Sequence, residues 1–144
     1  MRERVIKIKN IKSIEEILNV LNIYGNSMLP YLREGEKVFV CKYSPEELTP
    51  GVIIAFRCKG RNIVHRIVGE ENGRFITQGD ANLKPEKVLP SNILGVVKLI
   101  ERKDKILETT DNRTAKLYWQ CWRRLTPVRR YLLWAYRIYR KAVA

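Results

Sequence analysis

The sequence predicts a mainly β domain, a small antiparallel barrel or sandwich, with a short helix before it and an amphipathic helix after it. The first sign is a series of short segments, rich in β-branched and aromatic residues, that are separated by Gly, Pro or Asn. They span residues 37–42, 52–56, 62–68, 74–77 and 93–100. The second sign is Asn72-Gly73, because both residues tolerate the positive φ of a tight hairpin turn. Short strands joined by such turns favour antiparallel pairing over about residues 24–110.

A short helix is expected before these strands, over residues 13–22. Its apolar residues recur at helical spacing. Ser13, with Glu16 three positions later, has the pattern of a capping box, which marks the start of a helix.

The character of the chain changes after Asp111, the last acidic residue. Pro127 suits the first turn of a helix, which is predicted over residues 127–142. The chain is therefore expected to contain one domain, residues 1–111, followed by a helical tail, residues 112–144.

Basic charge gathers in this tail. The formal net charge of the chain is +13, and the 33 residues after Asp111 carry nine Lys or Arg together with all three tryptophans. On a helical wheel, five basic side chains fall within an arc of roughly 120°. They are Arg129, Arg130, Arg137, Arg140 and Lys141. Aromatic and aliphatic side chains occupy the other side, with Leu133 intruding on the basic arc.

Such a helix suits an anionic membrane surface, so residues 113–144 are expected to make peripheral contact with one. The alternative is a terminal helix that packs on the β domain and leaves its basic face in water. Nucleic acid is a weaker candidate for the partner, since the sequence has no recognised DNA-reading motif.

The sequence contains no long apolar segment. Its longest uninterrupted apolar stretches have about five residues, against the roughly 18 to 20 that span a bilayer, and the N-terminus lacks the apolar stretch of a secretory signal. A peripheral membrane or cytoplasmic location is therefore expected. Cys41, Cys58 and Cys121 are widely spaced, so free thiols are favoured over a zinc site, and no metal or organic cofactor is expected.

The segment from Tyr24 to Pro30 carries the first candidate for chemistry. A serine in a turn between Gly25 and Pro30 has an exposed hydroxyl and a fixed backbone. Its amide can donate to a developing oxyanion while its Oγ attacks a carbonyl carbon. Ser27 is therefore a candidate nucleophile, and Met28 and Pro30 are candidate oxyanion or substrate-binding residues. An ordinary turn serine would have the same local pattern.

The second candidate is His65, the only histidine, which alternation places on one face of a strand with Ile63 and Ile67. A neutral imidazole is the usual base for a hydroxyl nucleophile near neutral pH, although a lone histidine between apolar residues is also common in cores. Asp80 follows the second strand of the predicted hairpin. A carboxylate brought across the hairpin could hold the imidazole tautomer, as the third member of a triad does; otherwise Asp80 is a turn residue.

Together these segments resemble the type I signal peptidases. Gly-Asn-Ser-Met-Leu-Pro at 25–30, with the Glu-Gly-Glu and strand that follow, looks like the nucleophile box of that family. Residues 50–56 resemble its next strand, and Val-His-Arg-Ile-Val at 64–68 matches the strand that bears the base. Gln-Gly-Asp-Ala-Asn at 78–82 matches the Gly-Asp-x-Asn box. The boxes occur in family order over about residues 23–100, which is far more specific than any one of them.

The resemblance implies the β fold that signal peptidases share with the self-cleaving repressors of the SOS response. In the bacterial branch and in those repressors the base is a lysine at this strand position, whereas His65 is similar to the archaeal and endoplasmic-reticulum branch. The resemblance implies Ser27 as nucleophile, His65 as base and Asp80 as orienting acid. Glu86, at the place of a second acidic residue in that branch, is the alternative carboxylate. Cleavage after small residues is implied as well.

The sequence therefore predicts a serine endopeptidase that cleaves a signal or leader peptide. The transmembrane helix that precedes the nucleophile box in the family has no counterpart here. Two alternatives from other classes stay open: a non-catalytic membrane- or partner-binding module on a peptidase fold, and a regulator that cleaves itself or binds DNA. The intact Ser, His and Asp boxes favour the peptidase over the binding module.

Overall fold

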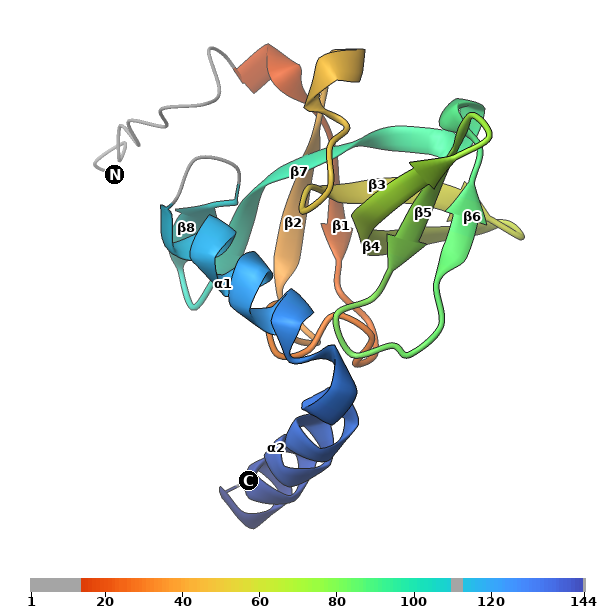
Figure 1. Cartoon of the computed structure of the whole chain (residues 1–144). Helices are drawn as coiled ribbons and strands as arrows, with labels where there is room; N and C mark the ends of the chain where they lie inside the picture. Colours follow the sequence, from red (N-terminus) through yellow and green to blue (C-terminus); the bar gives the residue numbers. More distant parts are fainter. Residues whose placement is uncertain (1–13, 110–112, 144) are drawn as a thin grey trace, which may run out of the picture.

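The computed structural model describes residues 14–109 and 113–143, and an antiparallel sheet of eight strands forms its body. The strands are β1 (Ile17–Asn22), β2 (Lys37–Cys41), β3 (Ile53–Cys58), β4 (Arg61–Glu71), β5 (Arg74–Gln78), β6 (Glu86–Val88), β7 (Ile93–Arg102) and β8 (Lys105–Glu108). Their hydrogen-bonded order is β1-β2-β7-β3-β4-β5-β6, and β8 pairs with β7. The predicted mainly β class is confirmed. In the described part of the chain the sheet is curved but open, rather than a closed barrel (Figure 1).

The long strand β7 joins the two halves of the sheet. It pairs with β2 and with β3, where Ile100 lies opposite Val38 and Val96 lies opposite Ile54. Apolar side chains of these strands form two buried clusters, and the first also includes Met28 and Leu32 from the loop between β1 and β2. Each fully buried side chain of this kind stabilises the fold by about 1.5–3 kcal/mol. This loop, residues 23–36, is called the Ser27 loop below, and the core anchors it.

The hairpin between β4 and β5 brings the candidate base strand beside the candidate acid segment. Its turn residues Asn72 and Gly73 have φ values of 51° and 74°, as the sequence predicted. The pairing register shifts by one residue at a bulge between Ile67 and Gly69. As a result Arg66 lies opposite Gln78, and the chain leaves β5 immediately beside the part of β4 that carries the histidine.

The helix predicted over residues 13–22 is wrong. Residues Ile14–Glu16 form one 3-10 turn and Ile17–Asn22 form strand β1. Ser13, the expected cap, lies outside the described residues. A helix this short is marginal in water, whereas the strand satisfies its backbone groups by pairing with β2 from Ile17 opposite Cys41 to Asn22 opposite Lys37. Pairing with a distant segment therefore overrides the local helical spacing.

The tail forms two helices, α1 (Arg113–Arg124) and α2 (Arg129–Val143), joined by a 3-10 turn (Thr126–Val128). Helix α2 corresponds to the helix predicted over 127–142. Helix α1 lies beside the sheet and α2 projects away from it (Figure 1). Within the described residues, neither helix nor any other has the length and apolar character needed to cross a bilayer.

Candidate active site

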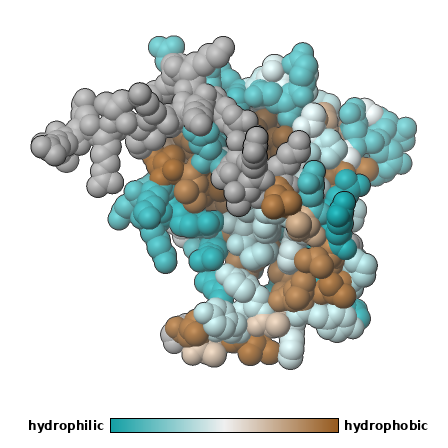
Figure 2. Space-filling view, turned by 60° about the vertical axis from the view of Figure 1, so that its left-hand side comes forward, coloured by the Kyte–Doolittle hydropathy of each residue, from teal (hydrophilic) through white to brown (hydrophobic). Residues whose placement is uncertain are grey.

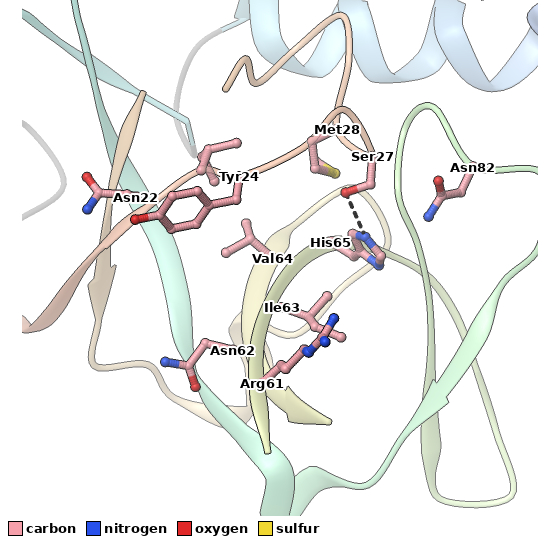
Figure 3. Close-up of a pocket in the computed structure, with 11 residues that line it drawn as sticks. Asn22, Tyr24, Ser27, Met28, Arg61, Asn62, Ile63, Val64, His65 and Asn82 are labelled. Carbon is pink, nitrogen blue, oxygen red and sulfur yellow. Dashed lines mark hydrogen bonds between the residues drawn. The ribbon is translucent and has the colours of Figure 1, made fainter. Parts of the chain in front are cut away.

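Ser27 and His65 meet at the end of the sheet where the Ser27 loop passes β4 (Figure 3). Ser27 Oγ lies 3.1 Å from Nε2 of His65, which is within hydrogen-bond range. The imidazole is buried and packs edge-on against Phe56, with 6.0 Å between the ring centroids. Two segments that are 38 residues apart in sequence are thus brought into contact by the fold.

The other nitrogen of the imidazole contacts Glu86, the first residue of β6. Nδ1 of His65 is hydrogen-bonded to Glu86 Oε1, and the same oxygen accepts a hydrogen bond of 2.9 Å from the Thr77 hydroxyl. Thr77 and Glu86 are register partners in β5 and β6, so the sheet itself fixes the carboxylate. When Nδ1 donates its proton to Glu86, Nε2 keeps a lone pair and can accept a proton from Ser27.

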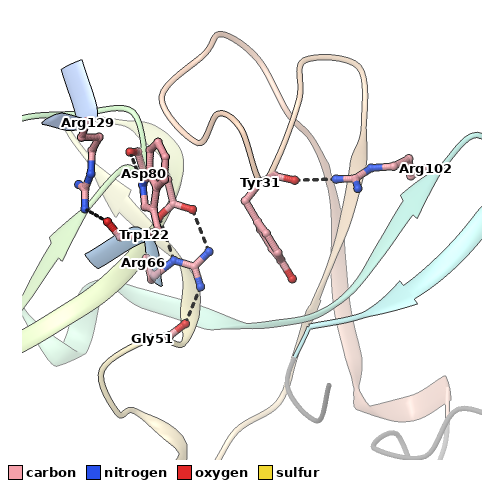
Figure 4. Close-up of polar contacts among 7 residues, drawn as sticks. All are labelled: Tyr31, Gly51, Arg66, Asp80, Arg102, Trp122 and Arg129. Atoms are coloured by element: carbon pink, nitrogen blue, oxygen red, sulfur yellow. Dashed lines mark hydrogen bonds and ion pairs between the residues drawn. The ribbon is translucent and has the colours of Figure 1, made fainter. Parts of the chain in front are cut away.

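Asp80 does not contact the imidazole. Its two carboxylate oxygens accept hydrogen bonds of 2.9 and 2.8 Å from Nε and Nη2 of Arg66, as Figure 4 shows. Arg66 also donates a hydrogen bond of 2.8 Å to the carbonyl oxygen of Gly51. Of the two carboxylates proposed from the sequence to orient His65, the structure thus brings Glu86 to the imidazole and Asp80 to Arg66.

The pair of Arg66 and Asp80 is buried, with exposed fractions of 3% and 2%. Burial alone would lower the pKa of the Arg66 guanidinium, but the hydrogen bonds and charge of Asp80 outweigh it and raise this pKa above its ordinary value. Arg66 therefore stays charged. A buried pair of this kind holds two segments together, here β4 and the loop that follows β5.

Residues 79–82, called the Asp80 turn below, lie directly behind Ser27. The Ala81 amide donates a hydrogen bond of 2.8 Å to the carbonyl oxygen of Ser27, and the Asn82 amide closes the turn on the Gly79 carbonyl at 2.8 Å. A Cβ on Gly79 would lie 2.5 Å from the Ser27 carbonyl oxygen and 3.0 Å from His65 Nε2. Only glycine fits this position without displacing the Ser27 backbone or the imidazole.

A groove of about 290 Å³ opens beside Ser27 and His65. Ile23, Met28 and Val64 contribute its apolar lining, and Arg61 and Asn62 contribute polar side chains (Figure 3). Residues 61–65 of β4 pair only with β3 among the described strands, and β1 pairs only with β2. Two strand edges with unpaired backbone groups therefore border the groove.

The remaining predicted site residues are placed as follows. Met28 is 2% exposed and belongs to the first apolar cluster, so its side chain both anchors the Ser27 loop and lines the groove. Pro30 is half-buried in the same loop. Within the described residues, no group of three His, Cys, Asp or Glu is arranged to hold a metal ion, and the cysteines are free.

Three residues of the site were missed by sequence reasoning. Arg66 holds Asp80, Thr77 holds Glu86, and Gly79 leaves room for Ser27. The sequence signal that could have revealed the role of Arg66 is its position next to His65, in a strand that the hairpin brings near Asp80. Gly79 was recognised only as part of the Gly-Asp motif. The close approach of Ser27 requires a residue without a side chain at this position.

Comparison of the sequence with known proteins identifies its family. Residues 3–98, more than half of the chain, match the family model described as Peptidase S24-like. The chain belongs to the Peptidase S24-like family. It is also 30% identical, over 70 residues, to the signal peptidase complex catalytic subunit SEC11C of Homo sapiens, Mus musculus and Canis lupus familiaris.

The aligned part covers 44% of this chain and 36% of each of these relatives, so the chain spans little more than a third of their length. No solved structure shows a significant match to the chain. The family assignment and the fold together define a peptidase domain, with the recognised region ending at residue 98, before the two tail helices.

Proposed function

We propose that this protein is a serine endopeptidase that cleaves a signal or leader peptide, with Ser27 as nucleophile, His65 as general base and Glu86 as the carboxylate that orients the base. The observation that carries the proposal is the continuous line of contacts from Ser27 Oγ through both imidazole nitrogens to Glu86. This is the arrangement of an activated hydroxyl nucleophile.

In the proposed reaction Ser27 Oγ attacks the scissile carbonyl carbon while Nε2 of His65 takes the hydroxyl proton. Glu86 accepts the Nδ1 hydrogen bond and stabilises the imidazolium that forms. The Ser27 amide is the proposed donor to the developing oxyanion. The imidazolium then gives its proton to the leaving amine, and a water molecule, deprotonated by the same imidazole, hydrolyses the acyl-enzyme.

The groove supports an extended peptide as the substrate. An extended chain can hydrogen-bond to the free edge of β4, residues 61–65, or of β1, as peptides do when they add a strand to a sheet. Its alternate side chains would then face the groove of about 290 Å³. The expectation of small residues near the cut comes from the resemblance to signal peptidases alone. Similarity to catalytic subunits of a signal peptidase complex supports signal or leader peptides as the class.

Helix α2 supports a membrane-bound substrate. Its contact with the body is made by Leu133 and Arg129, which are buried, and by Tyr136, which is half-buried. Arg129, which the sequence placed on the basic arc, instead stacks on the Trp122 ring at 5.3 Å. Most other side chains of α2 are exposed, including six large apolar or aromatic ones. They are Tyr131, Leu132, Trp134, Ile138, Tyr139 and Val143.

Apolar side chains accordingly gather on the projecting end of the molecule, at the bottom of Figure 2. Arg137, Arg140 and Lys141 are exposed on the same helix. Exposed aromatic and aliphatic residues beside basic ones suit the headgroup region of an anionic bilayer. We therefore place the proposed cleavage near such a surface, with α2 as the peripheral contact.

The proposal is tested with precursor peptides anchored in vesicles of phosphatidylglycerol and phosphatidylcholine. The residue before the intended cut is varied through Ala, Ser, Val, Leu and Arg, and products are identified by mass spectrometry. Cleavage after Ala and Ser but not after Leu or Arg is the expected result. Cleavage within the protein's own chain alone, or salt-sensitive DNA binding without peptide cleavage, would instead support the regulator.

A further inference from the structure

Helix α1 lies beyond the recognised family region, yet its aromatic residues pack behind the active site. Trp122 is 8% exposed, and its indole N–H donates a hydrogen bond of 2.9 Å to the carbonyl oxygen of Asp80 (Figure 4). The same ring packs with Leu29, two residues after the nucleophile, and with Leu133 of α2. Trp122 therefore contacts both the Asp80 turn and the Ser27 loop.

The neighbouring residues of α1 extend this contact to the buried ion pair. Tyr118 stacks on the Trp122 ring with 6.2 Å between centroids, and it also contacts the Tyr31 ring of the Ser27 loop at 5.1 Å. The Arg66 guanidinium lies 5.2 Å from the Trp119 ring and 4.9 Å from the Tyr31 ring. The aromatic face of α1 thus covers the ion pair that holds the Asp80 turn.

These contacts join two loops that must stay in register for Ser27 to reach His65. The Ala81 amide, one residue beyond the carbonyl that Trp122 holds, donates to the Ser27 carbonyl oxygen. A shift of the Asp80 turn would therefore move the nucleophile relative to the imidazole. The space around Gly79 is too small even for a Cβ, because Ser27 and His65 both lie against it. The packing here therefore tolerates little movement.

We infer that α1 is a positioning element of the active site, and that Trp122 is its principal positioning residue for the reaction of Ser27. The inference rests on the proposed function. Trp122 touches neither the substrate groove nor the two reacting side chains, and it acts through the Asp80 carbonyl and Leu29. Trp122 should therefore affect kcat and not the binding of peptide, because its contacts set the distance between the nucleophile and the base.

The test compares the full chain with Trp122→Phe, which keeps an aromatic ring and removes the N–H donor. Ile93→Val, a change in the second apolar cluster, is the control for a comparable loss of stability away from α1. For an Ala-containing precursor peptide, Trp122→Phe should lower kcat roughly 3- to 10-fold, the value of one lost hydrogen bond, and leave KM within about 2-fold. Ile93→Val should change neither.

A second readout does not depend on activity. His65 is the only histidine, so its ring nitrogens give unambiguous ¹⁵N signals without any peptide present. Trp122→Phe should shift these signals away from their wild-type positions, and Ile93→Val should leave them in place. If the wild type cleaves no peptide, the proposed function fails, while the ¹⁵N signals still decide whether α1 positions His65 and Ser27.

Two results would overturn the inference. One is a folded Trp122→Phe chain with wild-type kcat and wild-type His65 signals. The other is an equal fall in kcat for Ile93→Val, which would mark a general loss of stability. If Trp122→Phe does not fold, hydrogen exchange of the wild-type protein tests the inference instead. The Trp122 indole N–H and the Ala81 amide should then show similar protection factors. An unprotected indole beside a protected amide would contradict the inference.

Discussion

Glu86 and His65 are joined across three strands: the carboxylate at the start of β6 is hydrogen-bonded to Nδ1 of the imidazole in β4, with β5 between them. The Thr77 hydroxyl of β5 donates to the same carboxylate oxygen at 2.9 Å. Asp80, which is closer in the chain to the hairpin, faces Arg66 instead. The two acidic residues of this region therefore have different partners: Glu86 contacts the imidazole, and Asp80 contacts the buried guanidinium of Arg66.

Glu86→Gln is expected to lower kcat by roughly 10²- to 10⁴-fold, because an amide group cannot stabilise the imidazolium and can favour the wrong tautomer. Peptide cleavage followed over time gives kcat and KM for the variant. The matched control is Glu71→Gln, whose side chain is 52% exposed and lies 3.5 Å from Lys87 on the surface. Wild-type activity in Glu86→Gln, with a larger loss per folded molecule in Asp80→Asn, would return the orienting role to Asp80.

Asp80→Ala is expected to cost about 3–5 kcal/mol of folding free energy, because it leaves the Arg66 guanidinium buried without its carboxylate. For a domain of this size the melting temperature should fall by on the order of 10 °C, as thermal unfolding followed by circular dichroism would record. Replacing both partners, Arg66→Met with Asp80→Leu, should recover much of that loss. An unchanged melting temperature for Asp80→Ala would show that the pair does not hold the Asp80 turn.

Gly79→Ala should impair cleavage more than it impairs stability. The added Cβ would meet the Ser27 carbonyl oxygen at 2.5 Å, so the Ser27 loop must move away from the imidazole. Gly69→Ala is the matched control, since a Cβ there has its nearest neighbour, Ile76 Cδ1, at 4.0 Å. We expect a fall in kcat of about 10-fold or more for the first variant and little change for the second. Equal activities would mean that the Ser27 loop adapts freely.

Helix α2 should bring the protein to anionic vesicles. Each basic residue near such a surface contributes about 1 kcal/mol, and the exposed aromatic residues add apolar burial. Co-sedimentation should retain the wild type at low salt and less of it at high salt. A chain with Arg137→Glu, Arg140→Glu and Lys141→Glu should be released, and one with Trp134→Ser, Ile138→Ser and Tyr139→Ser should bind more weakly. Wild type that remains in the supernatant at low salt would contradict this contact.

These α2 substitutions are preferable to removal of the tail after Asp111. Truncation there would also remove Trp122 and its hydrogen bond to the Asp80 carbonyl, so a loss of activity could not be assigned to membrane contact. The substituted side chains are exposed, and their replacement leaves the buried contacts of Leu133 and Arg129 in place.

Several features of the fold could be predicted because they depend on neighbouring residues. The turn at Asn72-Gly73 follows from the ability of both residues to adopt positive φ, and the β4–β5 hairpin follows from that turn. The approach of Ser27 to His65 was expected from the ordered motifs rather than from local preference, and in the structure the two side chains lie 3.1 Å apart.

Other features depend on contacts that no local pattern reveals. An unbroken β4–β5 hairpin would place Arg66 opposite Gly79, but the bulge at residues 67–69 places it opposite Gln78, and this shift helps decide which acid reaches which partner. Strand β1 forms through pairing with β2, against its own helical spacing. The role of α1 depends on where its aromatic residues meet loops that lie more than 40 residues away in sequence.

The most direct test of the central claim is the rate of peptide cleavage by Ser27→Ala, His65→Ala and the double variant, measured against Ser91→Ala, an exposed serine outside the site. Because nucleophile and base act as a unit, each single variant should lose at least ~10⁴-fold in kcat and the double variant should be no worse. The melting temperature of Ser27→Ala should stay close to that of the wild type, whereas the two variants without the buried imidazole should unfold at a lower temperature, so their activity is expressed per folded molecule. Ser91→Ala should retain full activity. Cleavage at the wild-type rate by a folded Ser27→Ala chain would contradict the account.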